Sequence, residues 1–186
     1  MWGEVIILNK EKIKEAIKTL LEALGYDLND EHLKDTPQRV ADMWEEFITQ
    51  SLYNDDMPTW IEHSDLVIIK GIKFYSFCPH HLLPWYGEVH VAYIPNEHIV
   101  GLSKIVRIVR CVLSRLIIQE RATELIADEI SKKVGTPHVL VVVKARHLCM
   151  AMRGVRQDVD TITTATRGIF KENTIFRMEC LRFINM

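Results

Sequence analysis

The chain is poor in cysteine and has no long apolar run. Four of its 186 residues are cysteine, too few for a disulfide scaffold in a chain of this length. No stretch approaches the roughly 18 apolar residues that span a bilayer, and residues 1–9 lack the basic start of a secretory signal. We therefore expect a cytoplasmic protein that does not bind membranes.

The sequence also lacks an excess of positive charge. It has 23 Lys and Arg against 25 Asp and Glu, for a net charge of −2. Sequence-independent binding of nucleic acid depends on a broad positive field, so we expect no nucleic-acid partner, and any phosphate site has to be local. With 48% hydrophobic and 26% charged residues, the composition excludes a disordered chain.

Apolar residues recur at helical spacing in the first fifty residues. One such stretch runs from Asn9, an expected N-cap, to Gly25, an expected helix stop. A second stretch follows Thr36 and Pro37, which resemble an N-cap and a proline at the first helical position. We predict a pair of helices that forms an N-terminal extension over residues 1–60.

The remaining domain, residues 61–186, is predicted to alternate pairs of strands with helices. Strands are expected over 66–77, 86–94, 139–149 and 161–166, and helices over 103–113, 119–134 and 174–184. Two helices between two separated strand pairs indicate an antiparallel sheet with helices on one face. This is an α+β arrangement.

Two short clusters, Cys78–His81 and His147–Cys149, bring together thiols and imidazoles, which are the ligands that zinc prefers. His147 and Cys149 lie two apart at the end of a predicted strand, so they should share a face. If Cys78, His81 and Cys149 bind the metal, a fourth position stays open, as in zinc sites that activate water. His80 and His147 then remain for proton transfer.

Two alternatives for these clusters stay open. His147 could be the fourth ligand of a closed structural site. The cysteines could instead be core thiols and the histidines satisfied interior groups.

A second polar constellation could bind a nucleotide. Lys104 and Arg107 share a face near a predicted helix start, which suits a polyphosphate, although charge runs are often only a solvated face. Gln119 and Glu120 open the next helix, where an amide beside a carboxylate could read the edge of a purine; Glu120 could also simply favour the helix dipole. Arg153 adds a cation close to the second cluster.

The chain resembles the GTP cyclohydrolase I family. The matching stretches are DTPQRVADMWEEF, FCPHHLLPWYGEVHVAYIPN, VGLSKIVRIV, QERATELIADEI, ARHLCMAMRGV and FRMECLRFI, in the family's order. The resemblance implies an enzyme that uses Zn²⁺ to convert GTP to 7,8-dihydroneopterin triphosphate with release of formate. It also implies the tunnelling fold, and a homodecamer with active sites at subunit interfaces.

The resemblance also assigns roles to residues. Cys78, His81 and Cys149 would hold the zinc that activates water for attack on C8 of guanine, while His80 and His147 move protons. The remaining implied roles are guanine recognition by Gln119 and Glu120, ribose rearrangement with Ser103, and triphosphate binding by Lys104, Arg107, Arg153 and Arg39, the last from a neighbouring subunit.

Two positions depart from the family pattern. Pro79 stands where the family usually has Glu, and Ile117 where a polar residue is common. Two other functions stay open. One is a tunnelling-fold enzyme that acts on another purine or pterin, and the other is a catalytically silent, zinc-stabilised binding protein.

Overall fold

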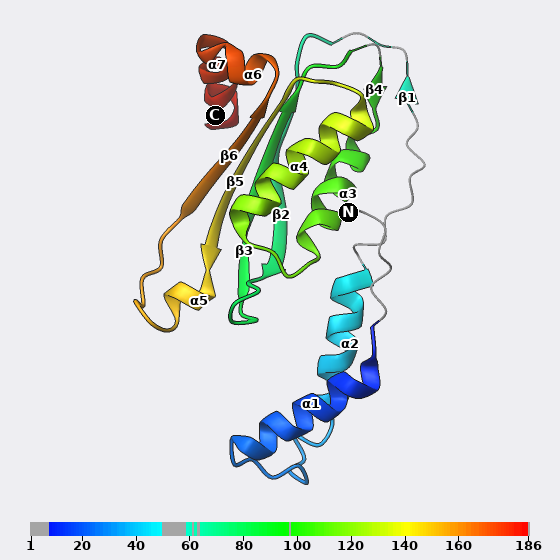
Figure 1. Cartoon of the computed structure of the whole chain (residues 1–186), viewed down its shortest axis with the longest axis vertical. Helices are drawn as coiled ribbons and strands as arrows, with labels where there is room; N and C mark the ends of the chain where they lie inside the picture. The colour runs from blue at the N-terminus through cyan, green and yellow to red at the C-terminus, as the bar shows by residue number, and fades with distance from the viewer. Residues whose placement is uncertain (1–7, 50–58, 61, 63, 97, 186) are drawn as a thin grey trace. The chain divides into compact units, whose positions relative to one another are not determined.

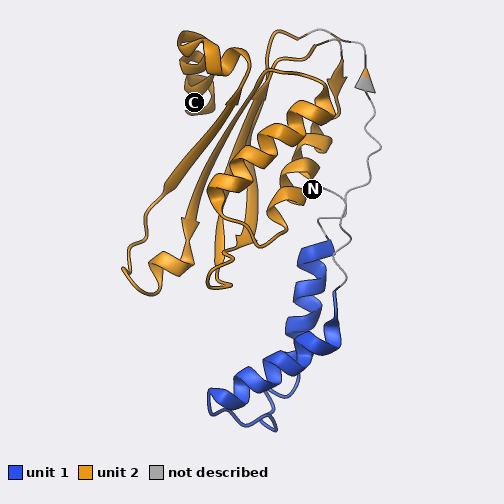
Figure 2. Ribbon diagram, in the orientation of Figure 1, with its two compact units in different colours: residues 1–52 blue, residues 53–186 orange. Residues whose placement is uncertain are grey.

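The computed structural model describes residues 8–49, 59–60, 62, 64–96 and 98–185. The chain forms two compact units, residues 1–52 and 53–186 (Figure 2). The predicted division after residue 60 stays a prediction. No helix in the described part of the chain combines the length and the apolar character needed to cross a bilayer.

The first unit contains the predicted helical pair, α1 (Lys10–Ala23) and α2 (Thr36–Thr49). Asn9 is the N-cap of α1, as predicted, because its side chain accepts a hydrogen bond from the backbone N–H of Lys12. The predicted start of α2 was one residue late. Thr36 already lies within the helix, so it is not the cap.

The second unit is built on a four-stranded antiparallel sheet in the order β2-β3-β5-β6 (Figure 1). Its strands are β2 (Val67–Phe77), β3 (Pro84–Tyr93), β5 (Val139–His147) and β6 (Thr161–Arg167). A separate two-stranded pair, β1 (Thr59–Trp60) with β4 (Ile99–Val100), was not predicted, because two residues are too few to show a period. The prediction of a mixed fold with an antiparallel sheet is confirmed.

Helices α3 (Leu102–Leu113) and α4 (Gln119–Val134) cover one face of this sheet (Figure 1). Successive side chains of a strand point to opposite faces of the sheet, so every second residue of a strand faces the helices. The residues of β3 and β5 that face these helices are completely buried: Val89, Val91, Tyr93, Val139, Val141 and Val143. The main core therefore lies between the sheet and these two helices.

The opposite face of the sheet is also partly covered, which the prediction of helices on one face did not include. Helices α6 (Ile169–Glu172) and α7 (Thr174–Asn185) contribute to a second core cluster that contains Leu140 and Val142 of β5. The whole run from Val139 to Val143 is apolar because β5 is buried on both faces. Cys180 lies in this second cluster and is buried.

Candidate metal centre and active site

The first predicted ligand cluster lies in the short loop that joins β2 to β3. The loop is closed by two backbone hydrogen bonds of 2.9 Å, from Cys78 N–H to the carbonyl of Leu83 and from Leu82 N–H to the carbonyl of Cys78. Leu82 has a φ of 54°, in the left-handed region that non-glycine residues rarely adopt. Within this loop Cys78 is buried and His81 is exposed. The tight turn presents both side chains together.

The second cluster lies where β5 ends. The strand stops at His147 and Cys149 belongs to α5 (Leu148–Ala151), a single helical turn. The prediction that the strand runs to Cys149 was therefore wrong by two residues. The turn gives His147 and Cys149 different neighbours, so they do not act as two equivalent side chains on one strand face.

The structure brings the three predicted ligands together. The ligand atoms of Cys78, His81 and Cys149 all lie within 4.8 Å of one another, and Cys78 Sγ is 4.0 Å from His81 Nδ1. Tetrahedral zinc bonded to sulfur and nitrogen separates such atoms by roughly 3.6 Å, so the donor set fits zinc after a small adjustment. Within the described residues this group does not include His147. The alternative of a closed site with His147 as fourth ligand is therefore not supported.

The thiol of Cys149 is harder to ionise than that of a free cysteine. Burial raises the pKa of the Cys149 thiol, and the neighbouring Cys78 thiol raises it further. A divalent cation bound at the cluster would stabilise the Cys149 thiolate. Arg153 contacts one of the predicted ligands: its Nη1 donates a hydrogen bond of 2.6 Å to His81 Nε2.

His147 sits beside the cluster in a defined orientation. Its Nε2 is 2.7 Å from Gln119 Oε1, and its ring stacks on Trp85 with centroids 5.1 Å apart and an angle of 5° between the planes. Burial lowers the pKa of His147, while the charge of Glu120 opposes that shift. Trp85 was missed by the sequence analysis. Only the strand register, which pairs Trp85 with His147, identifies it.

Comparison with known proteins identifies the family of this chain. Residues 13–185 match the model of the family described as GTP cyclohydrolase I. The chain belongs to the GTP cyclohydrolase I family. It is 49% identical to the GTP cyclohydrolase 1 of Hyperthermus butylicus over 95% of this chain and 92% of that one. The identity is 48% to the Aquifex aeolicus protein of the same name, over 95% and 97% of the two chains.

Two further similarities are more distant. The GTP cyclohydrolase 1 of Bacillus subtilis is 45% identical over 95% of this chain and 96% of that one. A crystal structure of an archaeosine synthase, QueF-Like, in the apo form matches with a TM-score of 0.45 at 22% identity, over 56% of this chain and 96% of that chain. The latter similarity is too low to carry an argument about this chain.

The other residues that the family resemblance singles out lie at the starts of helices. Ser103, Lys104 and Arg107 are in the first two turns of α3, where Ser103 and Arg107 are exposed. Glu120 is exposed at the second position of α4. Arg39 lies in α2, in the other compact unit.

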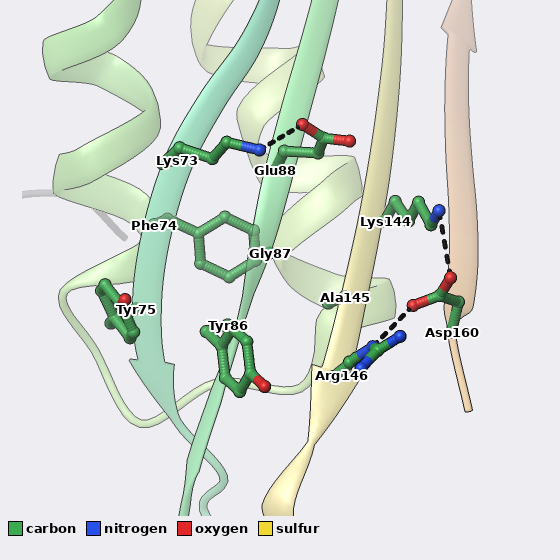
Figure 3. A pocket seen from close by; sticks show the side chains of 10 residues that line it. All are labelled: Lys73, Phe74, Tyr75, Tyr86, Gly87, Glu88, Lys144, Ala145, Arg146 and Asp160. Carbon is green, nitrogen blue, oxygen red and sulfur yellow. Dashed lines mark hydrogen bonds and ion pairs between the residues drawn. The ribbon is translucent and has the colours of Figure 1, made fainter. Parts of the chain in front are cut away.

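A separate cavity of about 340 Å³ opens on the sheet face opposite α3 and α4 (Figure 3). Its charged side chains pair with one another: Lys73 with Glu88 at 2.7 Å, and Asp160 with Lys144 at 3.0 Å and with Arg146 at 3.1 Å. None of the predicted site residues lines this cavity.

Proposed function

We propose that the chain is a metal-dependent GTP cyclohydrolase I. It would open the imidazole ring of GTP by hydrolysis at C8, release formate and rearrange the product to 7,8-dihydroneopterin triphosphate. The observation that carries the proposal is the cluster of Cys78, His81 and Cys149 beside the oriented ring of His147, in a chain that belongs to this family.

Cys78, His81 and Cys149 would hold a zinc ion through two thiolates and one imidazole. When bound there, zinc would supply Lewis-acid activation of water at neutral pH. Three protein ligands leave one position for water or substrate, and exposed His81 lies on the accessible side of the cluster. The buried Cys78 would supply one of the two thiolates.

His80 and His147 would move the protons. Hydrolysis at C8 requires a proton at N7 of guanine, and ring opening and loss of formate require further transfers, for which imidazole is suited near neutral pH. His80 lies on the ligand loop with its Nδ1 3.7 Å from Cys78 Sγ. His147 lies at the end of β5, two residues before Cys149.

The exposed polar residues at the helix starts would bind the nucleotide. The carboxylate of Glu120 can accept hydrogen bonds from the ring N–H and the amino group of guanine, which few other bases offer together. Lys104, Arg107 and Arg153 would bind the triphosphate, with Arg39 from a neighbouring subunit. Ser103 would act in the later ribose rearrangement. For Gln119 the guanine contact stays a prediction.

We also propose the tunnelling fold and a homodecamer in the cytoplasm. The order of two strands, two helices and two strands supports the fold assignment. Strands β2 and β6 form the two edges of the sheet, and an edge strand can pair with the edge of another copy. The use of Arg39 from a neighbouring subunit would follow from such an assembly.

The test is to incubate the purified, zinc-loaded protein with GTP and to follow formate together with a neopterin product. We expect both signals, and we expect chelation to abolish both. Formate without neopterin would show that the reaction ends after ring opening and would limit the proposal to hydrolysis. The absence of both signals would refute it in favour of another substrate or a silent binding protein.

A further inference from the structure

Gln119 is the one predicted substrate contact whose side chain is almost completely buried, with 1% of its surface exposed. Its Nε2 donates hydrogen bonds to the carbonyl of Val143 at 3.1 Å, to the carbonyl of Thr161 at 3.0 Å and to Thr163 Oγ1 at 3.1 Å. A carboxamide has only two N–H groups. None is therefore left over for a purine.

The orientation of this carboxamide is determined by its neighbours. Carbonyl oxygens only accept hydrogen bonds, so the group that faces Val143 and Thr161 has to be the NH₂ and not the oxygen. A flip would place Oε1 against two carbonyl oxygens and leave both N–H groups without these acceptors. Gln119 Oε1 therefore points at His147 Nε2, which it meets at 2.7 Å.

Two threonines fix the carboxamide in turn. Thr123 Oγ1 donates to the backbone carbonyl of Gln119 at 2.8 Å and lies 2.6 Å from Thr163 Oγ1. Since the Thr123 hydroxyl proton is used on that carbonyl, the Thr163 hydroxyl has to donate to Thr123. Thr163 is then free to accept from Gln119 Nε2. The hydrogen bonds thus run from the Gln119 side chain to Thr163, from Thr163 to Thr123, and from Thr123 back to the Gln119 backbone. They attach the start of α4 to β6.

We infer that Gln119 is a positioning residue for His147. Its oxygen can only accept, so the neutral imidazole carries its proton on Nε2, and Nδ1 is the nitrogen left with a lone pair for the substrate. Trp85 holds the ring plane from one side, and Gln119 fixes the rotation of the ring within that plane. The catalytic step assigned to His147 rests on the proposed function. The hydrogen bonds that orient its ring do not.

Three variants separate positioning from substrate contact. Gln119→Met keeps the length of the side chain and removes the bond to His147. Thr163→Val removes an acceptor of Gln119, while Thr163 itself is two hydrogen bonds away from His147. Thr164→Val is the matched control, because it makes the same chemical change at an exposed neighbouring position of β6.

A misplaced catalytic group commonly costs about 100-fold in rate, so we expect a decrease of this order in kcat for Gln119→Met. Thr163→Val should lower kcat by roughly 3- to 10-fold, and the KM for GTP should stay within about 3-fold in both variants, because neither removes substrate binding. Thr164→Val should behave as wild type. A KM raised about 10-fold or more in Gln119→Met, with Thr163→Val unaffected, would overturn the inference and restore the guanine contact.

Solid-state ¹⁵N NMR of histidine-labelled, zinc-loaded protein decides the same point without turnover. The His147 signals, assigned by their loss in His147→Gln, should show the Nε2–H tautomer in the wild type and in Thr164→Val. They should show a mixture in Gln119→Met, which lacks the acceptor, and still the Nε2–H tautomer in Thr163→Val, because the carbonyls of Val143 and Thr161 keep the carboxamide in the same orientation. An Nδ1–H tautomer in the wild type would refute the inference. A wild type that releases no formate from GTP would refute the proposed function instead.

Discussion

Replacing Gly87 with alanine should destabilise the second unit more than any ordinary surface substitution. Gly87 lies in β3 opposite Ala145 of β5. A Cβ atom at this position would lie 2.0 Å from the carbonyl oxygen of Lys144 and 2.7 Å from the Cα of Ala145. Both are backbone atoms, so no side chain can rotate away to make room.

The size of the effect follows from that geometry. Real Cβ atoms essentially never come closer than 3.0 Å to another heavy atom, so the strands would have to separate by at least about 1 Å. Neighbouring strands are only about 4.8 Å apart, and their hydrogen bonds lengthen with any such separation. Overpacking costs about 1–3 kcal/mol where side chains can adjust, and we expect about 3 kcal/mol here because they cannot.

Gly101→Ala is the control. Gly101 has a φ of −55°, which alanine adopts readily, and its nearest contact for a Cβ atom is Trp60 at an ordinary 3.6 Å. It should change the free energy of unfolding by less than about 1 kcal/mol, because the lower entropy of the unfolded chain and the preference of an N-cap for glycine over alanine act in opposite directions. Urea unfolding followed by circular dichroism measures both variants. Equal midpoints for Gly87→Ala and Gly101→Ala would refute the argument, because they would show that β3 and β5 separate at little cost.

Three further predictions concern pH, a surface ion-pair network and the metal. Burial lowers the pKa of His90, with Glu88 opposing, so below the ordinary value of 6.5 the unfolded chain takes up a proton before the folded one does. Stability should therefore fall with pH below about 6.5, and the fall should be smaller in His90→Gln; equal pH profiles in urea unfolding would contradict this. Arg167 lies 2.6 Å from Glu124 and 2.7 Å from Asp128, and both carboxylates are partly exposed. Arg167→Met should therefore lower the free energy of unfolding by about 1 kcal/mol, and by less at high salt. A loss that does not depend on salt would argue against the ion pairs. Chelation should abolish formate release and also lower the unfolding midpoint, and an unchanged midpoint would show that the metal contributes nothing to stability.

The sequence predicted the parts of the fold that depend on local signals. Helix α4 begins and ends where it was predicted, because Ile118 is extended and Gly135 has a φ of 73° that suits glycine at a helix end. The grouping of the ligands was predicted because two short clusters of metal-binding residue types are a local pattern. The short helix α5 was not predicted, since a single turn has no apolar period.

The orientation of the site residues could not be predicted from the sequence. The stack of Trp85 on His147 depends on the register of two strands that a long connection separates. The surroundings of Gln119 depend on carbonyl groups of both β5 and β6, which no side-chain pattern reports. Residue types therefore indicated which chemistry was present, while the donor and acceptor roles required the assembled sheet.

The bracing of the loop from Cys78 to Leu83 has a consequence for metal affinity. Because two backbone hydrogen bonds and a left-handed Leu82 already fix the loop, the conformational entropy of ordering it is lost during folding and not when the ion binds. A metal ion held by Cys78 and His81 would then bind more tightly than it would to a flexible loop with the same donor atoms. Substitution of Leu82 by glycine would relieve the strain of the positive φ. It would also make the loop more flexible, so a metal ion would bind less tightly. Fold stability and metal retention would move in opposite directions at this residue, which itself donates no ligand atom.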